Sequence, residues 1–151
     1  MDTHEYFMKM ALDEAKKAEA MDEVPVGAVI VKDGIIISKA FNTRETDKDA
    51  TCHAEMTAIK KACEILGGWR LIGCSMYVTL EPCLMCSGAI LQSRIEKLYI
   101  GAMDPKTGAA GSVLNAFEDY WFHHKCEVYA GILQEECSNI LKEFFRKKRA
   151  K

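Results

Sequence analysis

Short runs rich in β-branched residues alternate along this chain with segments whose apolar residues recur at helical spacing. The strand-like runs are at 26–31, 35–41, 76–80, 97–101 and near 126–129. The helix-like segments are at 3–20, 52–66, 82–93 and about 133–148. Because strands that alternate with helices pack as layers joined by right-handed crossovers, the order predicts an α/β layer fold.

Turn signals divide these elements. Lys32-Asp33-Gly34 separates the first two runs and predicts an antiparallel hairpin. Gly67-Gly68 should end the second helix, and Pro82 should open the third within its first turn. A loop rich in Gly and Ala is expected over 102–112, and the segment that follows to Lys125 has no clear pattern.

Length and composition bound the class of protein. The 151 residues are 49% hydrophobic and 28% charged, so we expect one domain spanning residues 1–151. The sequence has no apolar run of membrane-spanning length, and its first residues are polar, which predicts a cytoplasmic protein with no membrane partner. Seven cysteines are an odd number, which favours reduced thiols over a disulfide framework. We expect Cys63, Cys74, Cys126 and Cys137 to fill the core.

The formal net charge of -2 does not by itself indicate a nucleic-acid binder. Residues 146–151 nevertheless carry five basic side chains, which leaves a charge of -7 for the rest of the chain. Such a run either binds a polyanion or simply complements the carbonyl end of a helix, and the sequence does not decide between these interpretations.

Two short motifs carry the chemistry: His53-Ala54-Glu55 and Pro82-Cys83-Leu84-Met85-Cys86. Zinc prefers imidazole and thiolate donors in a tetrahedron, and catalytic sites keep the fourth position open for water. His53, Cys83 and Cys86 supply three such donors. We therefore predict a catalytic zinc site rather than a structural one.

The spacing also predicts the geometry. Cys83 and Cys86, three residues apart on a helix, can project from one face, and the positive end of that helix favours thiolates. His53 and Glu55 diverge inside a helix, so they can act together only at its start. We expect two helix starts that face one metal ion.

Glu55 has the chemistry of a proton shuttle. A catalytic zinc lowers the pKa of its water from about 15.7 to about 7, which eases deprotonation by on the order of 12 kcal/mol. A nearby carboxylate can take that proton, deliver it to a ring nitrogen and protonate departing ammonia. Each motif alone could arise by chance or belong to a core, and Cys52 could complete a structural site. Adjacent side chains diverge, however, and such a site would leave Glu55 without a role.

At these motifs the chain resembles the cytidine deaminase-like superfamily of zinc base deaminases. More narrowly, it resembles the tRNA-specific adenosine deaminases over 24–149. The segments that carry the likeness are 24–29, 77–83, Gly101-Ala102 with Asp104, 106–112 and 144–146. The resemblance implies a three-layer α/β/α fold around a mixed five-stranded sheet, a homodimer, and one Zn²⁺ per subunit without an organic cofactor. It also implies that wobble adenosine in a tRNA anticodon stem-loop becomes inosine, after zinc-activated hydroxide attacks the amino-bearing ring carbon.

The resemblance also implies roles for individual positions. His53, Cys83 and Cys86 match the metal ligands, and Glu55 matches the proton shuttle. The positions that match base contacts are Val26, Asn42 and the backbone of Ala54. The positions that match contacts to the flanking RNA are Asp104, Lys106, Arg146 and Arg149. From the residues alone, Asn42 and Asp104 could instead be ordinary turn residues.

The chain departs from the family pattern at Cys52 and over 117–122, which puts the fit to RNA there in doubt. We expect Trp121 and Phe122 to make core or dimer contacts, while His123 and His124 either contact RNA or lie in an exposed loop. Two rival functions remain. A deaminase of a free base or nucleoside would need no basic tail, and a zinc-stabilised RNA-binding protein would have no use for Glu55.

Overall fold

A mixed β-sheet forms the centre of the chain in the computed structural model, which describes residues 2–119 and 124–150. The strands of this five-stranded sheet are β1 (Gly27–Lys32), β2 (Ile35–Phe41), β3 (Cys74–Leu80), β4 (Lys97–Ala102) and β5 (Glu127–Ala130). Their spatial order is β2-β1-β3-β4-β5. β1 is antiparallel to both β2 and β3, whereas β3, β4 and β5 run parallel.

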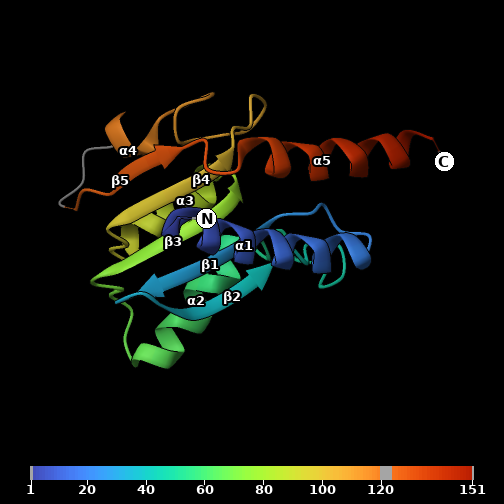
Figure 1. Cartoon of the computed structure of the whole chain (residues 1–151). Helices are drawn as coiled ribbons and strands as arrows, with labels where there is room; N and C mark the ends of the chain where they lie inside the picture. The colour runs from blue at the N-terminus through green and yellow to red at the C-terminus, as the bar shows by residue number, and fades with distance from the viewer. Residues whose placement is uncertain (1, 120–123, 151) are drawn as a thin grey trace.

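Helices cover both faces of this sheet. They are α1 (Thr3–Ala20), α2 (Ala54–Leu66), α3 (Leu84–Gln92), the short α4 (Ala116–Asp119) and α5 (Gln134–Arg149). α1 and α5 lie on one face, and α2 and α3 lie on the other (Figure 1). The predicted α/β/α layers and mixed sheet are therefore confirmed.

One hydrophobic core lies on each face of the sheet, because successive side chains of β1 point to opposite faces and are buried on both. Ala28 and Ile30 pack toward α2 and α3, whereas Val29 and Val31 pack toward α1. Gly27 lets α1 approach closely, because an added Cβ there would lie 2.0 Å from the Ala11 carbonyl oxygen.

The structure confirms most of the predicted elements and corrects two helix starts. Asp33 and Gly34 both have positive φ, which is the backbone of a tight hairpin turn, and Gly67 ends α2 in the left-handed region. α2 begins at Ala54 rather than at residue 52. α3 begins at Leu84, so the prediction that Pro82 lies in its first turn is wrong.

The segment after β4 is a loop followed by α4. Trp121, Phe122 and His123 lie outside the described residues. His124 is half-buried, and its Nε2 lies 2.7 Å from the Ile95 carbonyl oxygen, so it is not the exposed loop residue that was one of the two expectations.

Among the other cysteines, Cys74, Cys126 and Cys137 are buried and Cys63 packs against the core. Among the described residues, no helix has the length and apolar character needed to cross a membrane.

Candidate active site

Two helix starts meet at the motif residues. His53 is the N-cap residue of α2, Cys83 is the N-cap residue of α3, and Cys86 follows in the first turn of α3. Their donor atoms all lie within 4.8 Å of one another. Neither cap residue bonds its own helix through its side chain, so imidazole and thiol remain available to a ligand while the helix ends add positive potential.

The donor spacing fits tetrahedral zinc. His53 Nδ1 lies 3.7 Å from Cys83 Sγ and 3.5 Å from Cys86 Sγ. With bonds of about 2.0–2.1 Å to nitrogen and about 2.3 Å to sulfur, a tetrahedral ion holds such donors about 3.6 Å apart. The geometry and the nitrogen and sulfur donors both suit Zn²⁺.

The two thiols differ sharply. A hydrogen bond from Cys86 holds the pKa of Cys83 well below its usual range, against the opposing effect of burial. The same bond, together with burial, raises the pKa of Cys86. One thiolate is thus already favoured beside His53, and a cation in this position would stabilise the second.

Cys52 does not belong to the donor group. Among the described residues, the cluster of His, Cys, Asp and Glu side chains that could hold a metal contains His53, Cys83 and Cys86. Burial, and then the nearby Asp49 and Asp47 carboxylates, raise the pKa of Cys52 and favour its neutral thiol. Three protein donors leave room for a fourth ligand, as a catalytic site requires.

Glu55 lies in the first turn of α2 beside these donors and is 4% exposed. Burial raises the pKa of its carboxyl group to about 7, against the opposing effects of its own backbone N–H and the His53 charge. A carboxyl group that titrates near neutrality can both accept and donate a proton.

A cavity of about 150 Å³ opens beside this group. Its lining residues are Val24, Val26, Asn42, Arg44, His53, Ala54, Glu55, Leu80, Glu81, Cys83, Asp104 and Thr107. The structure thus brings Val26, Asn42, Ala54 and Asp104 to the same cavity as the metal donors.

The other expected RNA contacts do not line this cavity. The side chain of Lys106 is exposed, and its backbone N–H donates to Asp104 Oδ1 at 3.0 Å. Arg146 and Arg149 lie in the last turn of α5, where Arg146 pairs with Glu143 at 2.9 Å.

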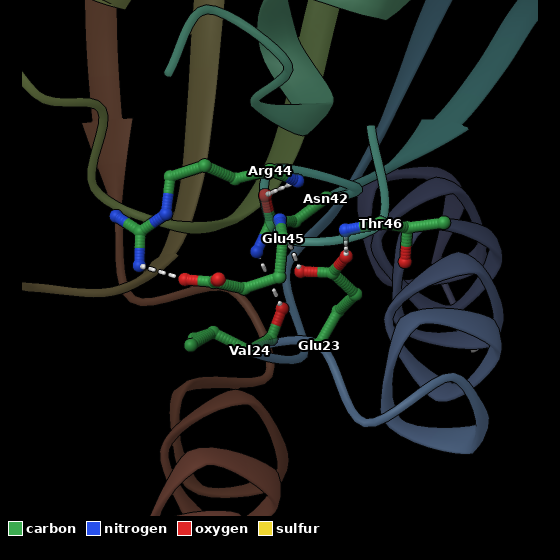
Figure 2. A network of polar contacts seen from close by, with 6 residues as sticks. All are labelled: Glu23, Val24, Asn42, Arg44, Glu45 and Thr46. Carbon is green, nitrogen blue, oxygen red and sulfur yellow. Dashed lines mark hydrogen bonds and ion pairs between the residues drawn. The ribbon is translucent and has the colours of Figure 1, made fainter. Parts of the chain in front are cut away.

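Asn42 both orders a turn and lines the cavity, although the sequence offered a turn residue and a base contact as alternatives. Its Nδ2 donates to the Val24 carbonyl oxygen at 3.2 Å, and its Oδ1 accepts from the Arg44 backbone N–H at 3.1 Å, so it orders a turn (Figure 2). It also faces the cavity, and an amide can make about four hydrogen bonds, so it retains capacity for a ligand.

A buried carboxylate fixes the same turn. Glu23 is 1% exposed and accepts from the backbone N–H groups of Glu45 at 3.1 Å and Thr46 at 2.6 Å (Figure 2). Burial acts to raise the pKa of Glu23, but hydrogen bonds from Thr46 and Glu45 and the Arg44 charge outweigh it and lower the pKa.

Sequence reasoning missed several lining residues: Val24, Arg44, Leu80, Glu81 and Thr107. Glu81 directly precedes the Pro82-Cys83 motif, and that position was the available signal. Leu80 is the last residue of β3, and Val24, Arg44 and Thr107 come to the cavity through loops whose paths no local pattern specifies.

Comparisons with known proteins agree with this geometry. Residues 1–102 match the family model of the cytidine and deoxycytidylate deaminase zinc-binding region. The chain is 51% identical over 151 residues to the tRNA-specific adenosine deaminase of Bacillus subtilis (strain 168), covering 100% of this chain and 94% of that protein. It is 54% identical over 147 residues to the tRNA-specific adenosine deaminase of Aquifex aeolicus (strain VF5), covering 96% of this chain and 95% of that protein.

Two solved structures are similar in fold and sequence. One comes from a study of A-to-I editing by tRNA:A34 deaminases at the wobble position of transfer RNA, with a TM-score of 0.87, 48% identity, and coverage of 90% of this chain and 99% of that one. The other is guanine deaminase from Bacillus subtilis, with a TM-score of 0.66, 36% identity, and coverage of 100% of this chain and 96% of that one.

Proposed function

This chain belongs to the zinc-binding deaminases and, within them, to the tRNA-specific adenosine deaminases, and from that premise we propose how its residues convert adenosine to inosine. The reaction is hydrolytic: water replaces the amino group of the wobble adenosine of a tRNA and ammonia leaves. The observation that supports this assignment most directly is a group of three zinc-compatible donors, two of which line one cavity together with a buried glutamate and an amide.

His53, Cys83 and Cys86 would hold the metal. A zinc ion bound there supplies a Lewis acid that lowers the pKa of a water molecule toward neutrality. Glu55 would accept the proton of that water and deliver it to the ring nitrogen beside the amino-bearing carbon. It would then take the proton of the hydroxyl group newly bonded to that carbon and give it to the departing amine, so that ammonia leaves as the carbonyl forms. Its raised pKa suits this exchange, because a shuttle must release the proton as readily as it takes it.

The remaining wall orients the base. Val24 and Val26 offer apolar surface to the faces of a purine, and Asn42 can donate to or accept from its edge. Ala54 begins α2, where the first backbone N–H groups of a helix have no partner within the helix. These groups favour a flipped-out base held by its edge, as zinc deaminases that act on polynucleotides require.

The partner is a tRNA anticodon stem-loop, bound partly through its phosphates. Among the described residues that line the cavity, Arg44 carries the positively charged side chain. Asp104 and Lys106 lie in the loop beside the cavity, and Arg146 and Arg149 add positive charge in the last turn of α5. Phosphate contacts of this kind release counterions, so a salt-sensitive KM is expected.

We further propose a cytoplasmic homodimer with one Zn²⁺ per subunit. Leu84, Val113 and Leu114 are 59%, 54% and 47% exposed, and Leu84 and Leu114 line one apolar hollow beside α3. An exposed apolar surface next to the active site suits a second copy of the chain. Light scattering of Leu114→Glu should show monomers where the parent chain shows dimers, and equal masses would exclude this surface.

The test of function is inosine formation by the purified protein on an adenosine-containing anticodon stem-loop, with free adenosine, guanine and cytidine in parallel. Inosine in the stem-loop, absent with Glu55→Ala, is the expected result. Turnover of guanine instead would keep the zinc chemistry and overturn the substrate. Zinc binding without turnover of any substrate would favour an RNA-binding protein.

A further inference from the structure

Glu81 is a second buried carboxylate at the cavity, and the mechanism above gives it no task. It follows the last residue of β3 and stands two residues before Cys83. It is 3% exposed, and its backbone N–H donates to the Ala102 carbonyl oxygen at 2.8 Å. A carboxylate so far removed from water requires compensating hydrogen bonds.

The loop after β4 supplies those bonds. Glu81 Oε1 accepts from the Asp104 backbone N–H at 2.8 Å and from the Ser112 hydroxyl. Glu81 Oε2 accepts from the backbone N–H groups of Ala110 at 2.9 Å and Ser112 at 3.0 Å. One side chain therefore ties both ends of the 104–112 loop to the strand that leads into the metal site.

Gly108 completes this arrangement. A Cβ on Gly108 would lie 2.2 Å from Glu81 Oε1 and 2.6 Å from the Asp104 carbonyl oxygen. The backbone therefore rests directly on the carboxylate, with no room for a side chain. The Ala109 N–H also donates to the Pro82 carbonyl oxygen at 2.9 Å, which ties the same loop to the residue before Cys83.

This loop forms one wall of the cavity. Asp104 and Thr107 line it, and the Thr107 hydroxyl donates to Asp104 Oδ2 at 2.8 Å. We propose that Glu81 is a positioning residue: its carboxylate holds the 104–112 loop at a fixed place relative to the metal donors, so that the wall is formed before RNA binds. This proposal deepens the proposed function and rests on it.

Glutamine at this position is a sharp test because it keeps the size of the side chain but not its bonding. Both carboxylate oxygens accept from backbone N–H groups, so either orientation of an amide points an NH2 donor at another donor. Loss of a hydrogen bond to a charged group lowers the equilibrium constant for ordering the loop by about 10-fold or more. The apparent affinity falls with the fraction of protein whose loop is ordered, whereas saturating RNA restores that fraction, so KM should rise by at most the same factor and kcat should not fall.

The experiment compares zinc-loaded wild type with Glu81→Gln, Gly108→Ala and the pair combined. We expect peptides covering 102–112 to exchange their amide hydrogens about 10-fold faster in either single variant, KM for the stem-loop to rise by up to about 10-fold, and kcat to stay within about threefold. The bound zinc should be unchanged. The double variant should be little worse than either single one, because both break the same contact.

Glu14→Gln is the matched control, since Glu14 is 4% exposed but lies in α1 and pairs with Lys17. It should alter neither loop exchange nor KM. Unchanged exchange in Glu81→Gln, loss of its zinc, or a fall in kcat with KM constant would each overturn the positioning role. If wild type makes no inosine, the proposed function fails, and hydrogen exchange alone then decides whether Glu81 holds the loop.

Discussion

Replacing Glu55 with glutamine should remove catalysis without lowering the stability of the fold. The side chain is 4% exposed, and burial raises its pKa from 4.5 to about 7. At about 1.36 kcal/mol for each unit of pKa, the ionised carboxylate at pH 8 costs the folded chain about 3 kcal/mol. Glutamine has nearly the same size and no charge, so the substitution removes this cost.

The pH dependence of this stability gain follows from the linkage between protonation and folding. A carboxyl group whose pKa is raised on folding destabilises the folded state above that pKa, and the penalty disappears as pH falls below its ordinary value. The gain from Glu55→Gln should therefore be largest at pH 8 and vanish near pH 4. A zinc ion nearby favours the carboxylate, so in the zinc-loaded protein the gain lies between zero and about 3 kcal/mol.

The catalytic rate of Glu55→Gln should fall, whereas its folding stability should not. Loss of general acid and base catalysis lowers kcat by about 10²–10⁴-fold, while zinc remains bound because the donor set is intact. The measurements are inosine formation under single-turnover conditions, metal content, and urea unfolding at pH 8. A variant that unfolds at lower urea than wild type, or keeps wild-type turnover, would refute the reasoning.

Three further predictions follow from the same geometry. Cys86→Ser should release zinc and lower the melting temperature, measured by metal content and thermal unfolding; a zinc-loaded variant would remove Cys86 from the ligand set. The double substitution Arg146→Ala with Arg149→Ala should raise KM for the stem-loop. The slope of log KM against log salt concentration should fall by about one to two units, and an unchanged slope would exclude phosphate contacts by α5. Glu23→Gln should lower the unfolding free energy by about 1–3 kcal/mol at pH 7, because two backbone N–H groups lose a charged acceptor. Since folding lowers the pKa of Glu23, this difference should shrink as pH falls through that lowered pKa, and a constant difference between pH 7 and pH 3.5 in urea titrations would contradict it.

Local patterns were sufficient for most of the fold. The hairpin was predicted because Asp33 and Gly34 tolerate positive φ, and α1 was predicted in full because its periodicity is long. The antiparallel pairing of β1 with β3 lay beyond any local pattern, because it depends on the contacts that the crossover through α2 allows.

The two wrong helix starts have a common physical cause. α1 begins with a capping box in which Asp2 accepts from the Glu5 backbone N–H, so the start of α1 can be predicted from the sequence. The N-cap residues of α2 and α3 are His53 and Cys83, which make no side-chain cap bond. The helical pattern predicted α2 from residue 52, and the preference of proline for the first turn predicted α3 from Pro82, so both starts were placed two residues too early. The backbones of His53 and Cys83 are extended, and their side chains lie at the metal position instead of capping a helix. Departure from a local rule thus occurs where the chain carries its chemistry.

The rest of the cavity wall, beyond the positions that the resemblance implied, could not be predicted for a different reason. The metal donors can be recognised in the sequence because zinc restricts both the residue type and the spacing of its ligands. Glu23 is one of 22 acidic residues, and in the sequence it is indistinguishable from a solvated surface charge. Glu81 differs only in its place before Pro82-Cys83, which does not reveal that it is buried. Folding buries both and surrounds each with backbone N–H groups from a distant loop, 43–46 for one and 104–112 for the other. Because the two loops carry Arg44, Asp104 and Thr107 to the cavity, loop substitutions that leave these carboxylates intact should retune substrate choice without disturbing the metal donors.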